Sequence, residues 1–278
     1  MSTLFLVATP IGNLEDITMR AVRILGEVSL IAAEDTRRTR VLLNHFNIHS
    51  KLISYHEHNK LIRVDTILDA LENGDVALVS DAGTPALNDP GYLLVRTVLE
   101  RGFQVSPIPG PCAPLAALVA SGLPTDKFTY LGYFPRKKGE RISHLEKMKN
   151  ISQTLVYLES PNRLMITLVD LIDIFGDRKI AVARELTKIH EEIFRGALSD
   201  AAVHFEENPP RGEITIVIAG ALAEDNKWLS DQVIASIKES LGLGKAPSEI
   251  AKELAKESGW QRREVYNLIT EVQKNPSV

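Results

Sequence analysis

Residues 75–85 read DVALVSDAGTP, a short apolar run followed at once by a loop of small residues, glycine and proline. Such a run with such a boundary is typical of a buried β-strand. Similar runs occur before and after it, separated by helix-length amphipathic segments, and this alternation predicts a mostly parallel sheet with crossover helices. The predicted strands are 3–8, 30–33, 51–54, 75–79 and 104–108, and the predicted helices include 62–71 and 91–101.

The middle of the chain has more closely spaced strands and fewer helices between them. This spacing predicts a mixed sheet in a second α/β domain that begins near residues 113–123. The predicted elements are strands 128–132, 154–159, 179–183, 191–196 and 213–219, and a helix at 198–207.

The last part of the chain has only helical periodicity, in segments 229–241, 247–257 and 261–273. Pro247 stands at a helix start, Gly259 at a predicted C-cap, and Trp260 is available for a small core. Three short helices with a sharp turn resemble a helix-turn-helix, but any small three-helix bundle has the same pattern. Contact of this segment with nucleic acid therefore stays open.

The length of 278 residues favours two compact units with a small appendage. We expect domains at 1–116, 117–223 and 224–278, with a linker at 221–226. Hydrophobic and charged contents of 44% and 24% are those of an ordinary globular protein, without a signal peptide or a membrane-spanning run.

Charge and cysteine content restrict the function further. The net charge of −4 excludes a globally basic nucleic-acid binder, so any contact with RNA must come from local patches. The single cysteine, Cys112, excludes an intrachain disulfide, makes a cysteine zinc site improbable and suits a reducing cytoplasm.

Three loops rich in glycine and proline follow predicted strands, at residues 9–13, 80–85 and 109–113. In open α/β sheets, ligands bind beyond the carboxyl ends of the strands. Small residues let main-chain groups approach a ligand closely, which suits a flat, mostly neutral cofactor. Ordinary tight turns are the alternative. No G-x-G-x-x-G follows the first strand, and residues 242–245 lack the P-loop spacing, so a dinucleotide enzyme or an ATPase is disfavoured.

Nine ordered blocks of this sequence carry a resemblance to a known family. They are VATPIGNLEDIT, AAEDTRRT, SYHEHN, VSDAGTPALNDPG, PGPCAPLAALVASGLP, LGYFPRKK, LESPNRL, ARELTK and RGEITIVIAG. In order and spacing, the chain resembles the ribosomal small-subunit RNA methyltransferase I family, a branch of the tetrapyrrole methylases. The resemblance covers nearly the whole chain, including the helical C-terminal segment.

The resemblance implies a two-domain fold with S-adenosylmethionine in the interdomain cleft, and a homodimer. It also implies methyl transfer to the ribose 2′-hydroxyl of a cytidine in the decoding region of small-subunit (16S) ribosomal RNA, within the 30S particle. The positions that match cofactor contacts are Pro10, Ala82, Gly83, Thr84, Leu87, Cys112, Ala113, Glu159 and Leu186. Tetrapyrrole enzymes usually carry Gly-Asp-Pro where this chain has Gly83-Thr84-Pro85, and Asp81 could supply the missing carboxylate.

Two basic patches are candidates for RNA contact. The first follows an aromatic pair, and cations beside aromatic rings suit an unstacked base and its phosphates. Its members are Tyr133, Phe134, Arg136, Lys137, Lys138 and Arg141, with Lys147 and Lys149 beyond them. The second patch comprises Arg37, Arg38 and Arg40. The alternative for both is a solvated surface.

Transfer to a ribose hydroxyl needs a proton acceptor, because the pKa of that hydroxyl lies far above neutral. The carboxylates nearest a strand end are Glu34, Asp35 and Glu185, and Lys188 could stabilise a developing alkoxide. Glu34 or Asp35 is preferred, although ordinary salt bridges explain all four residues equally well. The segment 56–58, His-Glu-His, lacks further ligands in view, so no metal is expected.

Two rival functions remain open from the sequence. One is methylation of a tetrapyrrole of the uroporphyrinogen or precorrin type, which would use the same cofactor cleft. The basic loop and the helical tail argue against it, since a small macrocycle requires neither. The other is a catalytically silent RNA-binding assembly factor that retains the fold.

Overall fold

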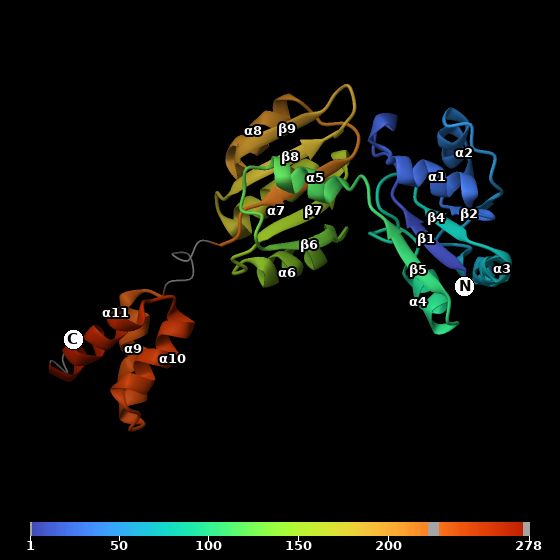
Figure 1. The fold of residues 1–278 in the computed structure, drawn as a ribbon. Helices are drawn as coiled ribbons and strands as arrows, with labels where there is room; N and C mark the ends of the chain where they lie inside the picture. The colour runs from blue at the N-terminus through green and yellow to red at the C-terminus, as the bar shows by residue number, and fades with distance from the viewer. Residues whose placement is uncertain (1, 222–227, 275–278) are drawn as a thin grey trace.

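The computed structural model describes residues 2–221 and 228–274 (Figure 1). Its first sheet has five strands, β1 (Thr3–Val7), β2 (Leu30–Ala33), β3 (Leu52–Ser54), β4 (Val76–Val79) and β5 (Gln104–Ile108). Their spatial order is β3-β2-β4-β1-β5, and every neighbouring pair is parallel. The predicted parallel sheet is confirmed.

Helices cover both faces of this sheet, as parallel strands with crossover connections require. They are α1 (Met19–Glu27), α2 (Thr36–His45), α3 (Lys60–Asn73) and α4 (Tyr92–Glu100), with a short 3-10 helix, η1 (Leu14–Asp16). Alternate residues of β2 enter opposite cores: Leu30 packs with the α3 and α4 side, whereas Ile31 packs with the α1 and α2 side. Because both faces of the sheet are packed against helices, the loops at the carboxyl ends of its strands are held in place.

The second sheet is mixed, as predicted. Its order is β6-β7-β10-β8-β9; β6 and β7 are parallel, and the other pairs are antiparallel. The strands are β6 (Phe128–Tyr133), β7 (Thr154–Glu159), β8 (Lys179–Arg184), β9 (Glu192–Ala197) and β10 (Ile214–Ile218). The last strand in the chain thus lies at the centre of the sheet.

Four helices accompany the second sheet (Figure 1). Its larger core lies under α6 (Lys138–Met148), α7 (Pro161–Phe175) and α8 (Leu198–Glu207). The helix α5 (Ala113–Ala120) directly follows the third glycine-rich loop, and its Ala117 and Leu118 pack on the opposite face of this sheet. The chain therefore passes from one sheet to the other at residues 109–112.

The C-terminal elements are α9 (Ser230–Gly242), α10 (Pro247–Ser258) and α11 (Arg262–Lys274). They share a core of their own, which includes Val233, Ile250 and Val265. Gly259 adopts the left-handed conformation after α10, as expected of a C-cap, and Trp260 Nε1 donates to the Trp228 carbonyl at 2.7 Å. The predicted helices are confirmed, and the proposed domain limits stay a prediction.

The boundaries of a few elements differ from the sequence expectation. The helix predicted at residues 62–71 begins earlier, at Lys60, in the structure. The Asn59 carbonyl accepts from the amides of Ile62 and Arg63, which adds these residues to the first turn. Of the predicted linker 221–226, only Ala221 lies within the described residues. Across those residues, no helix is both long and apolar enough to cross a membrane.

Candidate cofactor cleft and active site

The three glycine-rich loops are joined to one another at the carboxyl edge of the first sheet. Thr9 and Gly83 exchange main-chain hydrogen bonds of 2.9 and 3.0 Å. The Thr84 hydroxyl donates to the Pro111 carbonyl at 3.1 Å. Gly83 has φ +79°, a conformation that favours glycine, so the second loop depends on this residue for its path. The loops therefore form one connected structure.

A cleft of about 360 Å³ lies between this edge and the second sheet. From the second sheet it receives the end of β7 and the start of β10, with Leu158 and Ile214 among the lining residues. Most predicted cofactor contacts line it: Asp81, Ala82, Gly83, Thr84, Leu87, Cys112, Ala113 and Glu159. Pro10 precedes the lining residue Ile11, and Leu186 lines a smaller adjoining cavity that shares Ile11 and Ala113.

Close contacts join the two sheets on either side of the cleft. A Cβ on Gly12 would lie 2.4 Å from Lys188 Cγ, so the first loop packs directly on the segment that follows β8. Elsewhere, Tyr130 Oη of β6 donates to Asn88 Oδ1 at 2.6 Å. A Cβ on Gly132 would lie 2.6 Å from Asn88 Nδ2. The cleft is therefore held between two points of tight packing.

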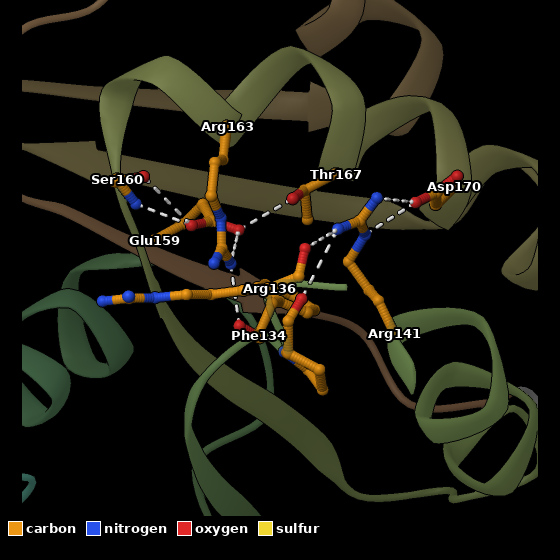
Figure 2. Close-up of polar contacts among 9 residues, drawn as sticks. Phe134, Arg136, Arg141, Glu159, Ser160, Arg163, Thr167 and Asp170 are labelled. Atoms are coloured by element: carbon orange, nitrogen blue, oxygen red, sulfur yellow. Dashed lines mark hydrogen bonds and ion pairs between the residues drawn. The ribbon is translucent and has the colours of Figure 1, made fainter. Parts of the chain in front are cut away.

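The carboxylate of Glu159 is held inside the second domain rather than free in the cleft (Figure 2). It accepts from the Ser160 amide at 2.7 Å, from Thr167 Oγ1 at 2.7 Å and from Arg163 Nη2 at 2.8 Å. The side chain is fully buried. Because its oxygens are satisfied by these donors, Glu159 shapes the wall of the cleft and orients Arg163.

Two arginines, the buried Arg141 and the half-buried Arg163, hold the loop after β6, as Figure 2 shows. Arg163 Nη2 donates to the Phe134 carbonyl at 2.7 Å, and Arg141 Nη1 donates to the carbonyls of Pro135 and Arg136, both at 3.4 Å. Arg141 also pairs with Asp170 at 2.6 Å, and both side chains are about 95% buried. This loop is thereby fixed beside the cleft.

Two predicted RNA contacts do not reach the surface. Phe134 is 1% exposed, and its ring stacks on Tyr157 with 3.8 Å between centroids. Arg141 is engaged with Asp170 and with the loop carbonyls. Neither side chain is accessible to a base or a phosphate. The prediction of RNA contact was therefore wrong for these two residues. It arose because both stand in a sequence run whose other predicted members are exposed.

The remaining predicted RNA residues are at the surface. Tyr133 is 57% exposed and lines the cleft together with Arg38. Arg38 Nη1 lies 3.2 Å from Asp81 Oδ2, which places one patch directly at the second loop. The other exposed cations are Arg37, Arg40, Arg136, Lys137 and Lys138.

The four predicted catalytic residues occupy different environments. Asp35 caps α2 and pairs with Arg37 at 2.7 Å, and hydrogen bonds from Arg37 hold the pKa of its carboxyl well below the usual range. Glu185 accepts from Lys188 Nζ at 2.8 Å, which lowers the pKa of Glu185. Both residues of this pair line the small adjoining cavity and not the main cleft.

Glu34 is the one member of this set that lines the main cleft. Its Oε2 accepts from the Asp81 amide at 3.3 Å. Burial raises the pKa of the Glu34 carboxyl. It therefore stays a candidate proton acceptor.

The first 202 residues carry a recognisable family pattern. The model of the tetrapyrrole (corrin/porphyrin) methylases matches residues 3–202. The chain belongs to the tetrapyrrole methylase family.

Several relatives of this methylase family share one name, "Ribosomal RNA small subunit methyltransferase I". The protein from Halalkalibacterium halodurans is 46% identical over 271 residues, which are 96% of this chain and 94% of that protein. The protein from Synechocystis sp. is 45% identical over 276 residues, 98% of this chain and 99% of that protein. The protein from Thermotoga maritima is 49% identical over 221 residues, 79% of this chain and 99% of that protein.

Solved methylase structures share the fold at lower identity. Uroporphyrin-III C-methyltransferase from Thermus thermophilus matches with a TM-score of 0.57 and 20% identity, over 78% of this chain and 94% of that chain. Cobalt precorrin-4 methyltransferase matches with a TM-score of 0.57 and 19% identity over the same shares. The expected two-sheet fold of tetrapyrrole methylases is confirmed.

Some residues of this methylase cleft were not singled out from the sequence. Asn88, Asp89, Tyr130 and Glu213 all line it. Three of them stand inside quoted blocks, VSDAGTPALNDPG and RGEITIVIAG, so the signal was present. The quoted blocks do not show which single side chains line the cleft, because the side that a loop residue faces depends on contacts with the other sheet.

The segment of residues 56–58 carries no ligand set in this methylase. Glu57 pairs with Lys60, and the rings of His56 and His58 face each other edge-on at 6.0 Å. Within residues 2–221 and 228–274, no group of three or more histidine, cysteine or acidic side chains could hold a metal ion.

Proposed function

We propose that this chain transfers the methyl group of S-adenosylmethionine to the ribose 2′-hydroxyl of a cytidine in the decoding region of small-subunit ribosomal RNA. The observation that carries the proposal is the cleft built from three joined loops and closed by the second sheet. Family membership supports methyl transfer, and relatives named for small-subunit ribosomal RNA support the substrate.

The cleft fits the methyl donor in shape and charge. Gly83 has φ +79°, a conformation that L side chains rarely adopt, so main chain without a side chain lines the cleft at this position. Ile11, Leu87 and Leu158 supply apolar surface for the adenosine part. The bound donor would supply an electrophilic methyl group on a positively charged sulfur. Carboxylates in the cleft favour that charge.

The RNA would approach over the mouth of the cleft, where Tyr133 can stack on an unpaired base. The exposed cations Arg136, Lys137 and Lys138 follow this residue and suit the adjacent phosphates. The buried Arg141 and the half-buried Arg163 hold the loop that presents them. We propose further that two copies form a homodimer in the cytoplasm, which would combine two sets of these patches.

The test is transfer of labelled methyl groups from S-adenosylmethionine to purified small ribosomal subunits. Free 16S ribosomal RNA and a tetrapyrrole precursor are offered in parallel reactions. We expect alkali-resistant label in the RNA of the subunits, since a 2′-O-methyl group blocks cleavage of the next phosphodiester bond. Label only in the tetrapyrrole, or in no substrate despite donor binding, would contradict the proposal and favour the corresponding rival.

A further inference from the structure

The strand order divides the carboxyl edge of the first sheet into two halves. The three glycine-rich loops follow β1, β4 and β5, which are neighbours in the order β3-β2-β4-β1-β5. The positions proposed for the methyl donor in these loops therefore lie at one half. The segments that follow β2 and β3 form the other half, and they carry Glu34, Arg38 and His56. A donor held by the glycine-rich loops leaves this second half for the acceptor nucleotide.

Glu34 is held between the end of β2 and the start of α2. Its amide donates to the Val79 carbonyl of β4 at 3.4 Å, which continues the pairing of these two strands. The next residue, Asp35, is the N-cap of α2, and its amide donates to Asp81 Oδ1 at 2.9 Å. Because the main chain is fixed on both sides, the Glu34 side chain enters the cleft from a defined position.

The Glu34 carboxylate is half-buried and keeps one oxygen available. Its Oε2 accepts from the Asp81 amide at 3.3 Å, and no donor from the described residues reaches Oε1. The nearby cation Arg38 pairs with Asp81 at 3.2 Å and not with Glu34. The charged and titratable groups around the carboxylate come from α2, from the segments after β3 and β4, and from β6; they are Arg38, His56, Asp81, Asp89 and Tyr133.

Two other carboxylates of the cleft have no oxygen free for a proton. Asp81 accepts from the Asp35 amide with one oxygen and pairs with Arg38 through the other. Glu159 is saturated by its three donors. A general base must keep an accessible lone pair in its charged form, and Glu34 meets this requirement.

The two remaining cleft carboxylates, Asp89 and Glu213, lie with the proposed donor positions. Asp89 follows the donor position Leu87 in the connection after β4. Glu213 lines the main cleft and also the adjoining cavity that contains Leu186. Their charges suit the positive sulfur of the donor. Among the described carboxylates that line the cleft, Glu34 alone belongs to the half formed after β2 and β3.

We propose that Glu34 is the proton acceptor of the methyl transfer, an inference that rests on the proposed ribose-methylating function. The 2′-oxygen attacks the sulfonium methyl in line, forming a C–O bond as the C–S bond breaks. The hydroxyl proton passes to Glu34 Oε1, and the sulfur keeps the bonding electron pair. The products are the 2′-O-methyl ribose, S-adenosylhomocysteine with a neutral sulfur, and a protonated carboxyl, which returns its proton to water.

The titration of Glu34 agrees with this role. Burial, together with the charge of Asp81, raises the pKa of the Glu34 carboxyl, although the Asp81 amide, Arg38 and His56 act in the opposite direction. The charged form is the active one, so kcat/KM should rise as the pH increases through this raised pKa and level off above it. A base is more effective as its pKa approaches the working pH, and most carboxyls titrate well below that pH.

The experiment compares wild-type protein with Glu34→Gln in the labelled-methyl assay on small subunits, over a range of pH. The amide oxygen of glutamine can still accept from the Asp81 amide, so the local structure is kept. We expect kcat to fall by about 10²-fold or more, the usual contribution of general base catalysis. The residual activity should lose the acidic limb of the pH profile. Calorimetry should show an unchanged Kd for S-adenosylmethionine, which also shows that the variant is folded.

Three further variants separate catalysis from other effects. Glu34→Asp should keep the acidic limb and more activity than Glu34→Gln. Histidine side chains change charge between about pH 5 and 8, so His56→Gln is measured as well and should keep the limb. Glu72→Gln makes the same chemical change at an exposed position on α3, and it should behave as wild type.

Three outcomes would overturn the proposal while the proposed function stands. Glu34→Gln could keep full kcat, or keep the acidic limb. It could lose donor affinity in parallel with activity, which would assign Glu34 to donor binding. His56→Gln could remove the limb while Glu34→Gln leaves it, which would make His56 the acceptor. Absence of transfer to RNA by the wild-type protein would instead contradict the proposed function itself.

Discussion

Gly83 is the residue on which the geometry of the second loop depends most directly. Its φ of +79° and its paired hydrogen bonds with Thr9 bring the loop main chain into the cleft. Thr84, the departure from the usual tetrapyrrole pattern, uses its hydroxyl to join this loop to Pro111. The two neighbours therefore act on loop shape, and neither contributes a charge.

We predict that Gly83→Ala weakens the binding of S-adenosylmethionine, because a side chain disfavours this backbone conformation and lies close to Ile11. Gly102→Ala is a matched control: Gly102 has φ +82°, lies at the opposite edge of the sheet before β5, and has no atom within 4 Å of an added Cβ. Both variants should lose about 1–2 kcal/mol of stability. Calorimetry should show a raised Kd for Gly83→Ala alone, and equal effects on Kd would contradict this account.

At the residue scale, the sequence located the cleft loops but not all of their side chains. Gly83, Cys112 and Ala113, which the resemblance assigns to the cofactor, line the cleft. It did not reveal the bond from Thr84 to Pro111, since the partners are 27 residues apart. Asn88 was missed because its partner, Tyr130, belongs to the opposing sheet.

Among the secondary-structure elements, α6 and α7 are coupled by the buried pair of Arg141 and Asp170. The basic run after β6 predicted a surface patch. One arginine in this run instead turns inward, where its guanidinium satisfies both a carboxylate and two loop carbonyls. Strand and helix periodicity could be read within each element. A pairing between elements has no local signature in the sequence.

We predict that Arg141→Met destabilises the protein by about 3–5 kcal/mol, because it leaves the Asp170 carboxylate buried and uncompensated. The double variant Arg141→Met with Asp170→Leu should recover much of this loss, since an apolar pair can replace a buried ion pair. Urea denaturation measures the free energy of unfolding of the wild-type protein, the single variant and the double variant. Arg96→Met breaks an exposed pair with Glu100 on α4 and should change stability little. An equally small effect of Arg141→Met would show that the buried pair is not required.

At the scale of the whole molecule, the cleft exists only because two sheets meet. Loops from the first sheet provide its floor, and β6, β7 and β10 provide the facing wall. The alternation of strands and helices predicted two such units. How closely they approach depends on Gly12 and Gly132, whose missing side chains leave space for Lys188 and Asn88. Sequence patterns cannot show such contacts.

The three C-terminal helices have a separate core, and α9 to α11 pack on one another. We predict that a chain ending at Ala221 keeps its fold and binds S-adenosylmethionine with an unchanged Kd. The separate core supports this, because its buried members all lie in α9, α10 and α11. Thermal unfolding and calorimetry are the measurements. A truncated protein that is unfolded, or that no longer binds the donor, would show that the helices support the cleft.

The central claim is that the methyl donor lies in the cleft between the two sheets. A crystal structure with S-adenosylhomocysteine tests this claim most directly. We predict the ligand against the main chain of Gly83 and Cys112, facing Leu158 from the second sheet. A ligand bound instead in the apolar groove beside Met19 and Phe46, or no binding at all in solution, would contradict the account.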